Sequence, residues 1–160
     1  MTQEENSAMP AFIADCHLGK LAKYLRLMGF DTLYFNHIDD NDLLALAAAE
    51  NRVVLTRDKF LSERKTDARI VFLKDTDTRR ALREVLNTFD IRQVPASFSR
   101  CIVCNTPLQV VEKEQILHRI PPKVIEHFSY FEYCPACDRI YWHGDHYRHM
   151  QQFLRSVLCD

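Results

Sequence analysis

Two Cys-x-x-Cys motifs in the C-terminal half narrow the possible folds of this chain more than any other feature. Cys101 and Cys104 form one motif and Cys134 and Cys137 the other, and residues 105–133 between them are long enough for a hairpin or two. Four thiolates at this spacing are typical of a tetrahedral Zn²⁺ site with no open position for a substrate, and such a site stabilises a module with a small core. We therefore predict a structural zinc site.

A redox role for the same motifs is the alternative. It would need a helix that starts directly after one Cys-x-x-Cys pair within a strand-helix-strand unit, and the sequence does not show one.

The first ten residues are polar and acidic, unlike a secretion signal, and no later segment is long enough to span a bilayer. We expect a cytoplasmic protein without a membrane partner, in a compartment that keeps thiols reduced. Outside the motifs, we expect Cys16 to be a buried or half-buried thiol and Cys159 to be incidental.

Length and charge limit what the chain can do. With 160 residues, 47% of them hydrophobic, it has room for a small α/β core and a compact second module. The 21 Lys and Arg residues nearly balance the 22 Asp and Glu residues. Without a global basic field, any binding to nucleic acid must come from local patches.

The N-terminal half alternates short apolar runs with amphipathic segments, the pattern of an α/β fold with a parallel sheet. Strands buried on both faces are predicted at residues 11–14, 32–35, 53–56 and 70–73. Helical periodicity predicts helices at residues 18–29, 42–51 and 78–89.

The pattern changes around residues 91–99, at Pro95 and a polar stretch. We place a domain boundary there. The predicted domains are a parallel-sheet sandwich over residues 10–92 and a small β-rich zinc module over residues 97–158. In the second, we expect strands at 108–112 and 128–133, a turn at Pro121 and Pro122, and a closing helix at 145–158.

Aspartates follow all four predicted strands. Because the carboxyl ends of parallel strands share one edge of a sheet, we expect convergence there of Asp15, Asp39, Asp40, Asp42, Asp58, Asp75 and Asp77. Clustered carboxylates repel one another unless a cation neutralises them, and Mg²⁺ and Mn²⁺ prefer oxygen ligands. Such ions activate water for attack on a phosphodiester. Helix capping is the alternative role for most of these residues, but no turn requires a charge at Asp15.

Several of these segments resemble the Mut7-C family, a PIN-like ribonuclease domain followed by a zinc ribbon. They are residues 15–31, which begin Asp15-Cys-His-Leu-Gly-Lys20; residues 39–47, which begin Asp39-Asp40-Asn-Asp42; and Val54-Leu-Thr-Arg-Asp58. Residues 100–108 and 137–147, around the cysteines, are similar to the zinc-ribbon half. The resemblance covers about residues 12–150.

The resemblance implies a PIN-like fold and cleavage of RNA. It implies that Mg²⁺ or Mn²⁺ is held by Asp15, by one or more of Asp39, Asp40 and Asp42, and by Asp58, and we select Asp15, Asp42 and Asp58 as catalytic. PIN domains commonly add an acidic residue from a helical insert, and no equivalent is evident here, so the number of catalytic metals stays open. RNA as substrate rests on the resemblance, since discrimination from DNA requires contacts to the 2′-hydroxyl.

Basic residues are the candidate contacts to RNA. Lys20 and Arg57 lie beside two of the aspartates and could bind the scissile phosphate or remain solvated. Near the cysteines, positive or titratable groups alternate with aromatic rings, as in modules that bind single-stranded RNA: Arg100, Arg139, Tyr141, Trp142, His143, His146, Tyr147 and Arg148. From this set we select Arg100 and Arg139 as RNA-binding. Packing on the zinc module or the first domain is the alternative for Tyr141 and the favoured role for Trp142.

We thus predict a metal-dependent ribonuclease whose zinc ribbon assists RNA binding. The alternative is a non-catalytic RNA- or ribosome-binding adaptor with a vestigial acidic pocket. A phosphatase-like enzyme would require a second aspartate in a DxD arrangement, which Asp15-Cys-His lacks. Oligomeric state, the RNA substrate and the polarity of cleavage are not indicated by the sequence.

Overall fold

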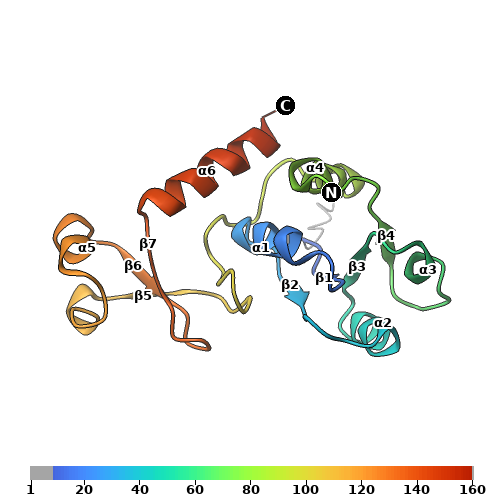
Figure 1. Ribbon diagram of the computed structural model, residues 1–160, viewed down its shortest axis with the longest axis horizontal. Helices are drawn as coiled ribbons and strands as arrows, with labels where there is room; N and C mark the ends of the chain where they lie inside the picture. Colours follow the sequence, from blue (N-terminus) through green and yellow to red (C-terminus); the bar gives the residue numbers. More distant parts are fainter. Residues whose placement is uncertain (1–8, 160) are drawn as a thin grey trace, which may run out of the picture.

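The computed structural model describes residues 9–159, which contain a parallel and an antiparallel sheet (Figure 1). Strands and helices alternate in the N-terminal part: β1 (Phe12–Ala14), α1 (Gly19–Leu27), β2 (Thr32–Tyr34), α2 (Asp40–Ala49), β3 (Val53–Thr56), α3 (Lys59–Ser62), β4 (Ile70–Phe72) and α4 (Thr78–Thr88). The four strands are parallel and lie in the order β2-β1-β3-β4. The predicted α/β class with a parallel sheet is confirmed.

Alternate residues of the central strands point to opposite faces of the sheet, and each face has its own core. On β1, Phe12 and Ala14 belong to a core that includes residues of α1 and α4, whereas Ile13 belongs to a core with residues of α2 and α3. On β3, Val54 shares the core of Ile13, and its neighbours share the other. Both central strands are buried along their whole length, which explains why they appear in the sequence as continuous apolar runs.

Aspartate side chains cap three helices that follow strands. Asp39 Oδ1 accepts a hydrogen bond from Asn41 N, Asp58 Oδ1 accepts from Phe60 N and Leu61 N, and Asp77 Oδ1 accepts from Arg80 N. Helix α2 therefore begins at Asp40, earlier than the predicted start at Asp42. The capping role considered for these residues is observed for Asp39, Asp58 and Asp77.

The C-terminal part contains β5 (Gln109–Val111), the short 3₁₀ helix η1 (Lys113–Gln115), α5 (Pro122–His127), β6 (Phe131–Tyr133), β7 (Ile140–Trp142) and α6 (Asp145–Leu158). Strands β5, β6 and β7 form an antiparallel sheet. The buried residues of its separate core are only Ile116, Ile120 and Phe131. The turn predicted at Pro121 and Pro122 is wrong, because Pro122 opens α5; proline is tolerated in a first helical turn, where its missing N–H has no partner to lose.

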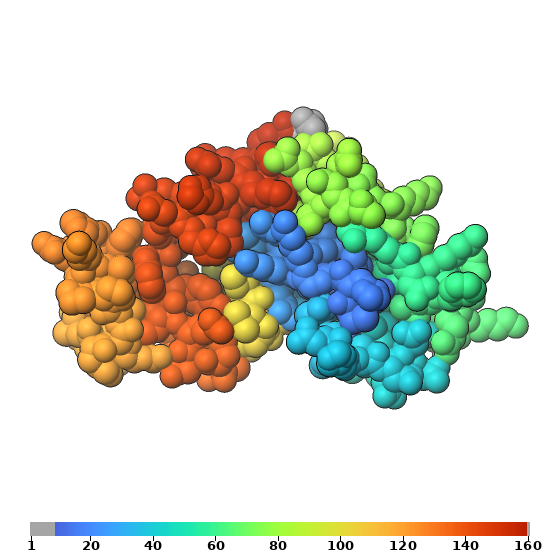
Figure 2. Space-filling view, in the orientation of Figure 1, coloured from blue at the N-terminus to red at the C-terminus, as the bar shows by residue number. Residues whose placement is uncertain are grey.

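Helix α6 returns from the antiparallel sheet to the parallel-sheet unit, where its C-terminal part contacts α4 (Figures 1 and 2). Leu154 and Val157 of α6 are buried in the same core as Phe12. The rings of Tyr24 and Phe153 stack with centroids 4.3 Å apart, and Arg83 Nη2 donates to Ser156 O at 2.6 Å. The helix predicted at residues 145–158 is therefore observed, and it completes the larger core.

None of the helices between residues 9 and 159 is both long and apolar enough to cross a membrane.

Candidate functional site

The four cysteines of the two motifs form one cluster beside the antiparallel sheet. Their sulfur atoms all lie within 4.8 Å of one another; Cys101 Sγ is 3.5 Å from Cys137 Sγ, and Cys104 Sγ is 3.3 Å from Cys134 Sγ. Zn–S bonds of about 2.3 Å in a tetrahedron separate the sulfurs by about 3.8 Å. A slight widening of the cluster thus admits the ion, and the donor set fits zinc. The four cysteines can hold a metal ion.

Hydrogen bonds and burial set the protonation of these thiols. Burial acts to raise the pKa of Cys104, but hydrogen bonds with Thr106 and the neighbouring cysteines outweigh it and lower the pKa to about 6. Burial, together with hydrogen bonds to Cys101 and Cys134, raises the pKa of Cys137 to about 12. The cluster therefore reaches its fully ionised form only when metal binding displaces protons.

Tyr141, from β7, provides a hydroxyl directed at the cluster. Its oxygen lies 3.0 Å from Cys101 Sγ. Burial and this contact raise the pKa of Tyr141, so that the phenol stays protonated and can donate to a thiolate. Hydrogen bonds of this kind orient metal ligands and tune their affinity.

The loop formed by residues 101–105, here called the first cysteine knuckle, closes the free edge of strand β2. Asn105, which follows Cys104, has a φ of 75° and is buried. Its Oδ1 accepts from Thr32 N at 2.9 Å and its Nδ2 donates to Asp31 Oδ1 at 2.7 Å. The carbonyl oxygen of Thr32, which points away from the neighbouring strand β1, accepts a hydrogen bond from Arg26 Nε at 2.8 Å. Both outward backbone groups of Thr32 thus have partners, and the edge of the sheet is not exposed there.

The guanidinium of Arg26 joins the same knuckle to α1. Arg26 Nη1 donates to the carbonyl oxygens of Ile102 at 3.2 Å and Val103 at 3.0 Å. Burial lowers the pKa of Arg26, while the neighbouring Cys104 and Cys101 act to raise it. A zinc ion with four thiolates carries a net negative charge, so this buried cation lies where it offsets that charge.

Asp15 and Asp58 are linked at the carboxyl edge of the parallel sheet by the hydroxyl of Thr56. Thr56 Oγ1 donates to Asp15 Oδ2 at 2.5 Å and accepts from Asp58 N at 2.9 Å. The other oxygen, Asp15 Oδ1, accepts from His17 N at 2.8 Å. Asp15 is only 5% exposed, and these two hydrogen bonds hold its carboxyl group in a fixed orientation.

The remaining acidic residues lie at helix starts along this edge. Asp40 and Asp42 are exposed in the first turn of α2, and Asp39 precedes them as the cap. Asp75 accepts from Asp77 N and pairs with Arg80 at 2.9 Å, which ties both residues to the start of α4. Backbone hydrogen bonding from Arg80 lowers the pKa of Asp77. Among the residues described, no three acidic groups bring ligand atoms within 4.8 Å of one another, and only the cysteines do so.

The basic residues selected from the sequence lie in different surroundings. Arg57 Nε donates to Asp75 O at 2.9 Å, and Arg100 Nη1 and Nε donate to Asn105 O and Gly29 O, so both guanidinium groups hold loops in place. Lys20 is exposed on α1 and lines a groove with residues of α4. Arg139 is exposed at the rim of a cavity beside the cysteines.

The aromatic residues near the cysteines mainly pack on one another. Trp142 contacts the core of Phe131, with ring centroids 6.5 Å apart, in agreement with the favoured packing role. The ring of Tyr147 lies between those of Phe98 and His143, with centroid distances of 4.0 Å and 3.9 Å.

The expectation for Cys16 is wrong: its side chain is exposed, because the turn after β1 directs Asp15 inward and the next residue outward.

Sequence reasoning missed three residues that organise these sites: Thr56, Arg26 and Asn105. A polar residue at the end of the buried run 53–56 was a usable signal for Thr56. Arg26, in contrast, lies in a helix with other basic residues, and nothing in its spacing separates it from a solvated side chain. Asn105 follows a cysteine knuckle, a position that favours a left-handed residue, but its partners at residues 31 and 32 cannot be inferred from the chain.

A parallel α/β unit with an acidic carboxyl edge, joined to an antiparallel sheet, defines an α/β protein whose four-cysteine cluster can hold a metal ion. The chain belongs to the Mut7-C family: the family model described as the Mut7-C RNAse domain matches residues 10–154. Membership in this family indicates a function of the ribonuclease type and RNA as the substrate. No curated protein and no solved structure matches the chain.

Proposed function

We propose that this protein is a Mg²⁺- or Mn²⁺-dependent, PIN-like ribonuclease of the cytoplasm, with a zinc ribbon that assists RNA binding. In this proposal residues 10–92 form the nuclease domain and residues 97–158 the zinc domain. The observation that carries it is the arrangement of Asp15 and Asp58 around Thr56 in a chain that matches a ribonuclease family.

The donor set at the sheet edge fits a hard divalent cation. The capping bonds use Oδ1 of Asp39 and of Asp58, and within residues 9–159 no hydrogen bond occupies Oδ2 of either residue. Asp40 and Asp42 are exposed beside them. Oxygen ligands from Asp15, Asp58 and one or more of Asp39, Asp40 and Asp42 would hold the ion, which when bound supplies an activated water and neutralises charge on a phosphodiester.

The chain's own residues orient and charge this edge. Thr56 and His17 N fix the Asp15 carboxylate, and Asp58 is fixed by the start of α3. We assign catalysis to Asp15, Asp42 and Asp58. Lys20 and Arg57 beside them, and Arg100 and Arg139 beside the cysteines, are proposed to attract the phosphates of RNA. The backbone contacts of Arg57 and Arg100 make them the weaker candidates of the four.

The test is cleavage of labelled single-stranded and structured RNAs by the zinc-loaded protein, with Mg²⁺, Mn²⁺ or no added divalent ion. Omission of the ion is preferable to chelation, because a chelator also removes zinc. Asp15→Asn and Asp58→Asn should each reduce cleavage at least a hundredfold. Asp90→Asn is the matched control, since Asp90 is exposed, away from the edge, and has a φ of 50° that asparagine accepts. Cleavage that survives both edge substitutions would refute the site.

The adaptor remains the second candidate function, because the described acidic side chains are not gathered into a preformed cluster. Tight RNA binding without cleavage in any divalent ion would favour it. The RNA cleavage assay on one preparation therefore distinguishes the ribonuclease from the adaptor.

A further inference from the structure

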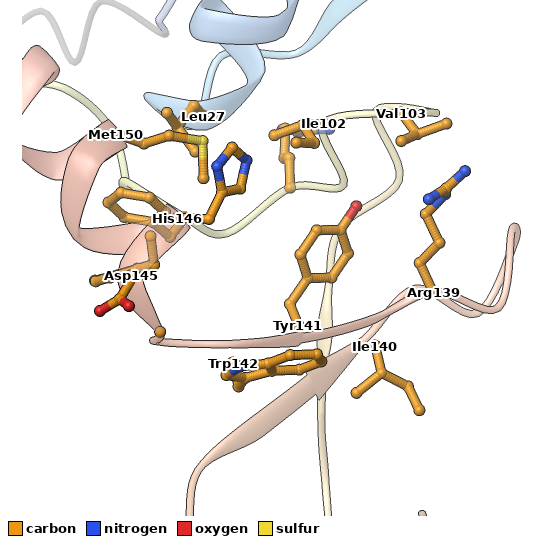
Figure 3. Close-up of a pocket in the computed structure, with 14 residues that line it drawn as sticks. Leu27, Ile102, Val103, Arg139, Ile140, Tyr141, Trp142, Asp145, His146 and Met150 are labelled. Atoms are coloured by element: carbon orange, nitrogen blue, oxygen red, sulfur yellow. The ribbon is translucent and has the colours of Figure 1, made fainter. Parts of the chain in front are cut away.

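A cavity of about 490 Å³ lies between the first cysteine knuckle, β7 and the start of α6. Its volume is in the range of small-molecule sites, roughly 300 to 1,000 Å³. Apolar walls come from Leu27, Ile102 and Met150, and aromatic rings from Tyr141 and Trp142. Figure 3 shows these side chains at the cavity, with Tyr141 and Trp142 on opposite sides of β7 and Arg139 at the opposite end of β7 from Asp145.

Two polar side chains of this cavity differ from their neighbours in having no partner. Within residues 9–159, neither the Arg139 guanidinium nor the His146 imidazole makes a hydrogen bond or an ion pair, and both are exposed. In Figure 3 the His146 ring is directed between Met150 and Ile102, toward the space above Tyr141. Arg100, which also lines the cavity, is in contrast held by the backbone carbonyls of Gly29 and Asn105.

We infer that this cavity binds one unstacked nucleobase of single-stranded RNA against the wall that Tyr141 and Trp142 provide, with His146 at the edge of the base and Arg139 on an adjacent phosphate. A flat ring suits a space with aromatic and apolar walls, and a guanidinium at its rim suits the charged group that accompanies every base. An imidazole can donate to or accept from the edge of a base. The inference rests on RNA being the substrate and adds a particular subsite to the proposed function.

The cavity and the acidic edge lie at opposite ends of α1. Asp15 lies in the sequence just before the turn that leads into Gly19, the first residue of α1. Leu27, the last residue of α1, lines the cavity. A helical rise of 1.5 Å per residue puts about 12 Å between the two ends of α1. A single strand of a few nucleotides can span that length, at about 3.4 Å per stacked nucleotide. The base would thus anchor the RNA outside the cleavage site.

Intrinsic fluorescence tests the inference directly, because Trp142 is the only tryptophan in the chain. Zinc-loaded Asp15→Asn protein, without Mg²⁺ or Mn²⁺, is titrated with oligoadenylate and oligouridylate hexamers and with a hexamer of abasic riboses. We expect saturable quenching by one or both base-containing hexamers and binding at least tenfold weaker for the abasic one. Quenching that the abasic hexamer matches would overturn the subsite, as would RNA binding, measured by anisotropy, without any quenching.

Variants separate contact with phosphate from a structural effect. Arg139→Ala should weaken hexamer binding about tenfold and reduce the slope of log K against log salt by about 0.7, the value for one phosphate contact on a single strand. His146→Ala should weaken binding and leave that slope unchanged. Arg92→Ala, an exposed arginine outside the cavity, is the matched control. An unchanged slope in the Arg139→Ala variant would refute its role.

The fluorescence titration tests the base-binding cavity separately from the cleavage assay, which tests the acidic edge. Cleavage by the native chain without base-dependent quenching would refute the subsite and keep the ribonuclease. Base-dependent quenching without cleavage would support the subsite in an adaptor. A short apolar peptide that competes with the hexamers and binds more tightly would identify the cavity as a protein-binding site and overturn the inference.

Discussion

Replacement of Asn105 by alanine tests how firmly the cysteine knuckle is joined to the parallel sheet. The side chain makes two hydrogen bonds across the junction, to Thr32 N and Asp31 Oδ1, and its backbone is left-handed. Thr32 is fully buried, so water cannot replace the lost acceptor. Asp31 retains Arg52 as a partner at 2.8 Å and is less affected.

The expected loss of stability in Asn105→Ala is the sum of two free-energy costs, one for the unpaired Thr32 N–H and one for the left-handed backbone of residue 105. A buried N–H left without a partner costs about 2 kcal/mol. Alanine in the left-handed region costs about 1 kcal/mol. Together these give about 3 kcal/mol, or a decrease in Tm of about 6 to 12 °C for a chain of this size.

Urea unfolding of the zinc-saturated protein, followed by circular dichroism, measures the effect. Asn51→Ala is the matched control, because Asn51 also has a positive φ, of 52°, but is exposed on the surface. The control should lose only the backbone term of about 1 kcal/mol. If Asn105→Ala loses no more stability than Asn51→Ala, the two side-chain bonds do not join the units as described.

Three further predictions concern the metal cluster and its surroundings. Tyr141→Phe should weaken zinc binding about 10- to 100-fold in competition with a chelator of known affinity, because it removes the hydroxyl beside Cys101; an unchanged affinity would contradict that role. Removal of zinc should abolish hydrogen-exchange protection in β5, β6 and β7 before β1 and β3, whose cores are larger; simultaneous loss would show a single cooperative unit. Burial acts to raise the pKa of Asp31, but hydrogen bonds from Arg52 and Asn105 outweigh it and lower the pKa. The stability that Asp31 adds over an Asp31→Asn variant should therefore be complete well above pH 3.8, its ordinary value, and shrink as pH falls below it; a difference that grows in acid would contradict this.

Local patterns predicted the elements of the fold well. Continuous apolar runs identified the strands β1 and β3 because both of their faces are buried, and helical periodicity identified α4. The cysteine motifs identified the metal cluster because ligand spacing is a local property. The start of α5 was missed, since two successive prolines fit a turn as well as a helix N-terminus.

Long-range contacts limited the prediction of the sites. The convergence of aspartates was inferred from the parallel sheet, yet the hydroxyl that links Asp15 to Asp58 depends on the register of β1 and β3. The roles of Arg26 and Asn105 depend on how the cysteine knuckle meets β2, and residues more than seventy positions apart in the chain are involved. Neither the register nor this junction has a signature in the sequence.

The return of α6 to the first core has a consequence for synthesis on the ribosome. Leu154 and Val157 are buried in the same core as Phe12, although α6 follows all four strands of the parallel sheet in the sequence. A nascent chain without α6 already has α1 and α4 on this face of its sheet, but it exposes the surfaces of these two helices that α6 covers. The core around Phe12 is therefore complete only after α6 has left the exit tunnel of the ribosome.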